Sequence, residues 1–160
     1  MPVELILLLL LLIANGAPVI TRVLLHDWMN FPLDGGYRFF DQQPLFGSSK
    51  TVRGILAAII ATAVAATLMG LSISQGALIG AMAMLGDLFS SFCKRRMKFA
   101  PSSMALGLDQ IPESLFPLLA VKTIFGLGWN SIAMLVIAFI ILELLLSQLL
   151  FRLNIRRRPY

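Results

Sequence analysis

The stretch from Gly86 to Arg96 combines residue types that could bind a metal-bridged polyphosphate. Asp87 ends an apolar run, Ser91 follows four residues later, and a group of cations comes next. These cations are Lys94, Arg95, Arg96 and Lys98. Residues spaced by three or four positions share one face of an α-helix, so Asp87, Ser91 and the cations could lie together. Such a face would offer a carboxylate for a divalent metal ion, a hydroxyl group and several cations, which suits a nucleoside triphosphate.

A second carboxylate, Asp109, lies beyond a short polar segment and directly before the next apolar run. If the two apolar runs form neighbouring helices, Asp87 and Asp109 can face each other across a cavity. Mg²⁺ typically takes one or two carboxylates, and substrate phosphates supply further oxygen ligands. The pattern therefore predicts a Mg²⁺ site at these two residues. In the alternative interpretation, Asp87 pairs with Lys94 or Arg95, and Asp109 caps a helix.

The composition indicates an integral membrane protein with one domain, residues 1–160. Hydrophobic residues make up 58% of the chain and the mean hydropathy is +0.87, whereas soluble domains are about 45–50% apolar. The net charge of +5 comes from cations at the ends of apolar runs, which favours a role in membrane orientation over nucleic-acid binding. A single cysteine and a single histidine exclude an intrachain disulfide and a Cys/His zinc site.

Five apolar segments predict an all-α integral membrane protein with five transmembrane helices. Their approximate ranges are 2–20, 54–71, 75–92, 111–127 and 129–151. Only Glu4 is charged near the start of the chain, which is unlike a secretory signal, so the first segment is expected to be retained. The connections 21–53 and 93–110 are then cytoplasmic loops. The first loop ends with Lys50 and several hydroxyl groups at a helix N-terminus, which suits an anion.

The distribution of cations predicts the orientation of these helices. If both loops and the C-terminal tail lie on one side, that side contains every Lys and Arg residue except Lys122. Positive loops face the cytoplasm, so we expect an external N-terminus, a cytoplasmic C-terminus and a polar cavity open to the cytoplasm. Arg156, Arg157 and Arg158 are expected to anchor the tail at anionic lipid headgroups.

Lys122, Glu143 and Asn15 also lie within the predicted membrane segments, where ionisable groups are candidates for function. A rise of 1.5 Å per residue would separate Lys122 from Glu143 by about 13 Å, so a direct ion pair is not expected. Lys122 is expected to satisfy carbonyls or a broken helix. Glu143 either joins the cytoplasmic site or supports Asn15 or a loop cation. Asn15 either makes a helix-packing hydrogen bond or lines a polar pocket.

A series of motifs in the right order resembles the CDP-archaeol synthase family, the short five-helix branch of the integral-membrane CTP:phosphatidate cytidylyltransferases. The motifs are Asn15-Gly16-Ala17-Pro18, Leu33-Asp34-Gly35-Gly36, Pro44–Gly47, Lys50–Gly54, Gly86–Arg96 and Leu108-Asp109-Gln110. This resemblance covers nearly the whole chain. It implies Mg²⁺-dependent transfer of CMP from CTP to an archaetidate-like or phosphatidate-like lipid, with release of pyrophosphate. It also implies a cell-membrane enzyme whose active site faces the cytoplasm.

Carried over by position, the resemblance implies that Asp87, Asp109 and Lys94 are catalytic and that the two aspartates hold the metal ion. The residues it implies for binding CTP are Asn15, Lys50, Arg53, Ser91, Lys94, Arg95 and Arg96. Asp34 is a loop residue without an assigned role. The chain departs from the family pattern at Cys93, where Ile is expected, and at Val52, where Trp is usual. An acidic residue usual after Gln110 is also displaced, and Glu113 could substitute one place away.

Two other classes of protein remain alternatives. A small membrane transporter would use Lys122 and Glu143 along its pathway, and a non-catalytic protein would bind anionic lipid through its basic loop. Both predict that Asp87→Asn is tolerated. The sequence leaves open the lipid tail, the base specificity, the number of metal ions and whether the protein forms a homodimer.

Overall fold

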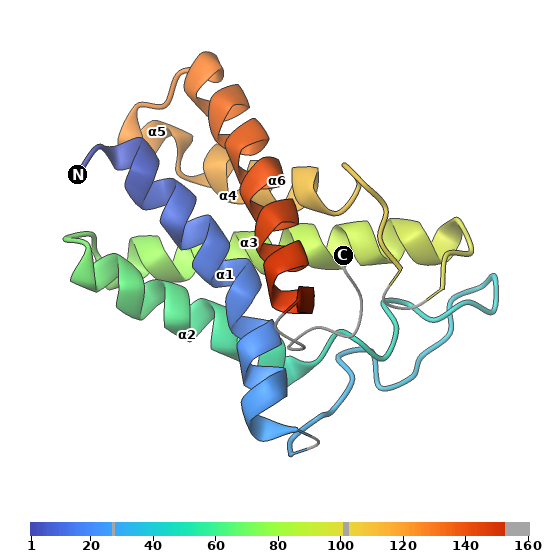
Figure 1. The fold of residues 1–160 in the computed structure, drawn as a ribbon. Helices are drawn as coiled ribbons and strands as arrows, with labels where there is room; N and C mark the ends of the chain where they lie inside the picture. The colour runs from blue at the N-terminus through green and yellow to red at the C-terminus, as the bar shows by residue number, and fades with distance from the viewer. Residues whose placement is uncertain (27, 101–102, 153–160) are drawn as a thin grey trace.

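The computed structural model describes residues 1–26, 28–100 and 103–152, and this part of the chain is all-helical, with no named strand (Figure 1). The helices are α1 (Val3–Leu25), α2 (Val52–Leu68), α3 (Ile73–Arg96), α4 (Gln110–Ala120), α5 (Lys122–Phe125) and α6 (Trp129–Arg152). The expected anchors Arg156, Arg157 and Arg158 lie outside the described residues. The predicted all-α class is confirmed.

Three helices, α1, α3 and α6, are long and apolar enough to cross a membrane. The apolar helix α2 is shorter, with 17 residues, and α4 has only 11. A straight span needs about 20 residues, because each adds about 1.5 Å toward a hydrocarbon core of about 30 Å. The protein is therefore a multi-pass membrane protein, while the count of five spans and their orientation stay predictions.

The predicted continuous helix over 111–127 is wrong. The chain leaves helical geometry at Val121, which separates α4 from α5. Pro117, inside α4, removes one backbone donor just before this break, and Gly126 ends α5 with a φ of +63°. Lys122 is the first residue of α5, and its ammonium lies 4.0 Å from the centre of the Trp129 ring.

Two helix ends were predicted too early. Helix α1 continues to Leu25, and α3 continues to Arg96, so Lys94, Arg95 and Arg96 occupy the last turn of α3 and not a loop. Cations are favourable there because the C-terminal end of a helix carries partial negative charge. Lys98 lies beyond the helix with a φ of +61°, so the predicted shared face does not extend to it.

Helix α3 packs against α2 on one side and α4 on another, and glycines permit both contacts. A Cβ atom added at Gly76 would lie 2.5 Å from the Cβ of Ala66 on α2. One added at Gly86 would lie 2.2 Å from the carbonyl oxygen of Pro112 on α4. Small residues at such positions allow helix backbones to approach closely. The loop between α1 and α2 runs beside the C-terminal end of α3 (Figure 1).

Candidate active site

Asp87 on α3 is paired with Lys50, which the first loop delivers from 37 positions away. The Lys50 Nζ atom lies 2.5 Å from Oδ1 and 2.6 Å from Oδ2, so the ammonium is held by both carboxylate oxygens. Each side chain is about one-fifth exposed. The alternative in which Asp87 pairs with Lys94 or Arg95 is therefore wrong.

Asp109 is paired with Lys94, whose Nζ atom lies 2.6 Å from Asp109 Oδ1 and donates to the Ser103 carbonyl at 3.0 Å. Both side chains are largely buried, with 9% and 15% exposure. Asp109 stands at the N-cap position of α4 but makes no capping hydrogen bond. Its Oδ2 atom instead accepts from the backbone N–H of Ala105 at 3.0 Å. The capping interpretation of Asp109 is wrong.

A third carboxylate, Glu113, joins this group from the first turn of α4. It is 7% exposed, and its carboxyl group is hydrogen-bonded to that of Asp87. It also interacts electrostatically with Lys50 and Glu143. Sequence reasoning noted Glu113 only as a substitute for a displaced acidic residue. Its position as an ionisable residue in an apolar segment was the available signal.

The charge of Lys50 is set by these three carboxylates. Burial acts to lower the pKa of Lys50, but Asp87, Glu113 and Asp109 outweigh it and raise the pKa above the ordinary value of 10.5. The side chain therefore remains a cation at neutral pH.

Arg95 and Ser91 are both buried in α3, each with 2% exposure. The Arg95 Nη2 atom donates to the Ala100 carbonyl at 3.0 Å. Its Nε and Nη1 atoms have no hydrogen-bond partner within the described part of the chain. Buried polar groups are rarely left without partners, and a guanidinium binds phosphate or carboxylate oxygens strongly. As far as the structure describes the chain, Arg95 thus keeps donors that an anionic ligand could satisfy.

Arg96 holds the first loop against α3. Its guanidinium pairs with Asp41 at 2.8 Å and donates to the Pro44 carbonyl at 2.7 Å. It also lies 4.8 Å and 5.0 Å from the ring centres of Phe39 and Phe92. These contacts fix the loop that carries Lys50, and a contact between Arg96 and CTP stays a prediction.

Arg53 joins α2 to the end of α1. It is 8% exposed, and its Nη1 atom donates to the backbone carbonyls of His26 and Trp28. Its donors in this structure serve the fold, so its predicted role in binding CTP also stays a prediction.

Asp34 organises the same loop. Its carboxylate accepts hydrogen bonds from the backbone N–H groups of Gly36, Phe46 and Gly47 at 3.0, 3.0 and 2.9 Å. Partial burial pushes the pKa of Asp34 upward, but these hydrogen bonds outweigh it and lower the pKa. Asp34 therefore has a structural role that the sequence left unassigned.

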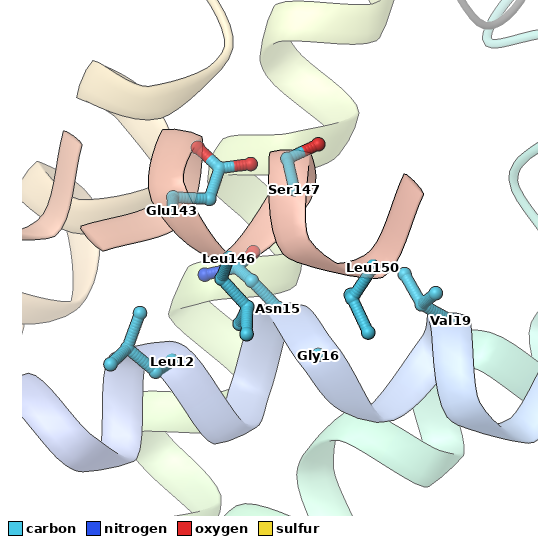
Figure 2. A pocket seen from close by; sticks show the side chains of 8 residues that line it. All are labelled: Leu12, Asn15, Gly16, Val19, Glu143, Leu146, Ser147 and Leu150. Atoms are coloured by element: carbon cyan, nitrogen blue, oxygen red, sulfur yellow. The ribbon is translucent and has the colours of Figure 1, made fainter. Parts of the chain in front are cut away.

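Asn15 lines a cavity of about 30 Å³ between α1 and α6, together with Glu143 and Ser147 (Figure 2). The Asn15 amide donates to the Leu11 carbonyl in its own helix at 3.0 Å. Glu143 also interacts electrostatically with Glu113 on α4. Glu143 therefore shares this cavity with Asn15, and its predicted role stays a prediction, while Lys122 lies elsewhere, against Trp129.

The fold and this site define a class: a multi-pass helical membrane protein with buried carboxylates and cations suited to a phosphate-bearing ligand. Within that class, the family model for CarS-like CDP-archaeol synthase matches residues 3–160, and the chain belongs to that family. The resemblance found in the sequence is confirmed.

Individual relatives agree with this assignment. A CDP-archaeol synthase of Sulfurisphaera tokodaii is 32% identical over 157 residues, which cover 93% of this chain and 90% of the relative. Relatives of the same name from Thermofilum pendens and Hyperthermus butylicus are 32% and 35% identical, and the match spans only 51% and 60% of their lengths. A solved intramembrane enzyme for archaeal membrane lipid biosynthesis superposes with a TM-score of 0.74 at 30% identity, covering 89% of this chain and 90% of the other.

Proposed function

We propose that this protein transfers CMP from CTP to a phosphorylated glycerolipid, giving a CDP-lipid and pyrophosphate. The observation that carries the proposal is the group of two ion pairs and one buried arginine on and beside α3, formed by Asp87, Asp109, Lys50, Lys94 and Arg95. It combines carboxylates with cations, and the Arg95 guanidinium has two nitrogen atoms without a hydrogen-bond partner among the described residues. Several relatives named CDP-archaeol synthase support the same activity. The cation distribution favours a site on the cytoplasmic side of the cell membrane.

The proposed reaction is a nucleotidyl transfer. An oxygen of the lipid phosphate attacks the α-phosphorus of CTP, a new P–O bond forms, and the bond between the α-phosphorus and the bridging oxygen breaks. Pyrophosphate leaves with that electron pair. Such a transfer needs positioning and charge neutralisation more than a protein nucleophile. In this reaction Lys94 and Arg95, joined by Lys50, would bind the phosphate oxygens.

The residues present also fit a Mg²⁺ ion. No group of three or more His, Cys, Asp and Glu side chains in the described residues could hold a metal. Mg²⁺ nevertheless needs only one or two carboxylates when a substrate supplies phosphate oxygens. Asp87 already holds a cation, the Lys50 ammonium, with both of its oxygens. When bound, Mg²⁺ would neutralise charge on the transferring and leaving phosphates.

The test is an incubation of purified protein in lipid nanodiscs with α-labelled CTP, Mg²⁺ and a panel of phosphorylated ether and acyl glycerolipids. We expect label to enter the organic phase with one class of lipid, and Asp109→Asn to abolish the transfer. Glu4→Gln is the matched control, because it makes the same carboxylate-to-amide change at the far end of α1.

The outcomes separate the proposed function from its alternatives. Label that enters the organic phase with wild-type protein but not with Asp109→Asn would establish the reaction and the lipid class. An absence of label with every lipid, in protein that elutes as a folded species, would refute the enzyme and favour a transporter or a lipid-binding protein.

A further inference from the structure

An apolar groove runs along the surface of the protein between α4 and α6, which pack against each other (Figure 1). It has a volume of about 410 Å³, and the eight residues that line it all have hydrocarbon or aromatic side chains. Pockets that bind small molecules typically have volumes of about 300–1,000 Å³. The groove is therefore large enough to hold part of a ligand, and its lining favours an apolar part.

The groove has a buried floor and an exposed rim. Its floor includes Ile132 of α6, which belongs to the same buried cluster as Leu118 and Val121. At the rim, Ile111 of α4 and Ile137 of α6 are exposed. Because α6 is long and apolar enough to cross a membrane, this rim faces the hydrocarbon of the bilayer. A lipid chain can thus enter the groove sideways from the membrane.

One end of the groove adjoins the candidate active site. Ile111 follows Asp109 by two residues, which separates their backbones by at most about 7 Å. Asp109 in turn holds the Lys94 ammonium at 2.6 Å. A lipid whose phosphate group is bound beside Lys94 therefore has the start of its chains close to Ile111.

The other end of the groove is formed by Trp129, the first residue of α6. The Lys122 ammonium lies 4.0 Å from the centre of the Trp129 ring, a contact that holds the ring in place. The lining residues of α6 extend from Trp129 to Ile140, which is about 16 Å along the helix axis. One leaflet contributes about half of a hydrocarbon core that is about 30 Å thick, so the groove matches the length of a single lipid chain.

We propose that the groove between α4 and α6 binds one hydrocarbon chain of the phosphorylated glycerolipid substrate. The start of the chain lies at Ile111 and its end at Trp129, while the phosphate group lies beside Lys94. This assignment rests on the proposed function, which supplies the lipid phosphate, and it adds the part of the protein that contacts the lipid tail. Bulk membrane lipid has similar chains, so the phosphate group is what distinguishes the two occupants.

The test locates the chain by photo-crosslinking in phosphatidylcholine nanodiscs. The probes are a phosphorylated ether glycerolipid and its acyl counterpart, each with a diazirine near the end of one chain. Peptide mass spectrometry should find label from at least one probe between Trp129 and Val136. A tenfold excess of the same lipid phosphate without diazirine should reduce this label about tenfold, because both compete for one site. An equal excess of lipid with the same chains but no phosphate should change it by less than about twofold.

Ala133 allows the groove to be filled without disturbing the core. It lines the groove and is exposed, so a phenyl ring at this position occupies groove space. A single methylene group in an apolar pocket changes substrate discrimination by about 10–200-fold. Ala133→Phe should therefore raise the KM for the lipid phosphate, and lower the label in α6, at least about tenfold. The KM for CTP should stay within about twofold. Ala81→Phe is the matched control, because it makes the same change at an exposed residue of α3.

Three results would overturn the inference: no label in the groove, label that the lipid without phosphate displaces as well as the lipid phosphate does, or equal labelling of Ala133→Phe and Ala81→Phe. The second result would assign the groove to bulk membrane lipid. Failure of the proposed function would look different. In that case CMP transfer to every lipid would be absent, while phosphate-dependent labelling of the groove would persist.

Discussion

Gly86→Ala tests whether the contact between α3 and α4 assembles the site. The new Cβ atom would lie 2.2 Å from the Pro112 oxygen, 2.5 Å from the Pro112 carbonyl carbon and 2.8 Å from the Glu113 nitrogen. All three are backbone atoms, so no rotamer change relieves the overlap. Ordinary contacts begin near 3.4 Å, and the difference of 3.4 − 2.2 Å requires the helices to separate by about 1 Å.

This displacement should affect stability and activity together. Overpacking of a close helix contact typically costs about 1–3 kcal/mol. A misplacement of about 1 Å at a reacting centre can reduce the rate about 100-fold. Asp87 adjoins Gly86, whereas Glu113 and Asp109 belong to the start of α4, so the shift separates the carboxylates themselves. We expect kcat for CMP transfer to fall about 100-fold.

Gly128→Ala is the matched control. A Cβ atom at Gly128 meets nothing within 4 Å, and the residue precedes α6, far along the chain from the site. Both variants would be measured by label transfer and by the midpoint of thermal unfolding. If Gly86→Ala retained the activity and unfolding midpoint of Gly128→Ala, the close approach of α3 and α4 would not be required, and the reasoning would be wrong.

Three further substitutions test the parts that hold the site. Asp34→Ala removes three hydrogen bonds from backbone N–H groups, so it should increase protease cleavage in the first loop. Because folding lowers the pKa of Asp34 below 3.8, the ionised carboxylate stabilises the loop above that pH. The cleavage rates of variant and wild type should therefore converge in acid. Arg53→Gln removes the donors to the His26 and Trp28 carbonyls, so the midpoint of thermal unfolding should fall. The KM for CTP, measured on folded protein, should stay within about twofold of the wild-type value. A tenfold rise in this KM would indicate that Arg53 contacts the nucleotide. Arg96→Lys keeps the charge but loses the planar guanidinium, and it should raise the KM and loosen the loop to proteases; unchanged proteolysis would contradict this.

Hydropathy predicted most of the helical fold because long apolar runs leave few other structures in a membrane. It could not predict the break at Val121, where each half still reads as apolar. Hydropathy also ended α3 at the first cations, although the helix carries Lys94, Arg95 and Arg96 in its last turn. Polar residues mark where a segment leaves the apolar core, and a helix often continues beyond that point.

The candidate site was predicted by residue type but not by partner. Lys50 and Asp87 were both identified, yet their pairing depends on the path of a loop that has no periodicity to read. Arg53 and Arg96 were grouped with the phosphate-binding cations, whereas the structure uses their donors for backbone carbonyls and loop contacts. Glu113 was considered only as a substitute for a displaced acidic residue, because its place beside α3 depends on the close helix contact that the missing side chain at Gly86 permits.

The pairing of the site charges explains how such a site can be stable without its substrates. A buried carboxylate or ammonium without a partner is costly, so groups destined for a metal ion or phosphates must be compensated beforehand. Asp87 with Lys50 and Asp109 with Lys94 provide this compensation. Under the proposed function, binding would exchange partners: the carboxylates would take a divalent cation while the lysines take phosphate oxygens. Each charged group would then have a neighbour of opposite charge both before and after the substrates bind. Neither state would leave an isolated charge in the site.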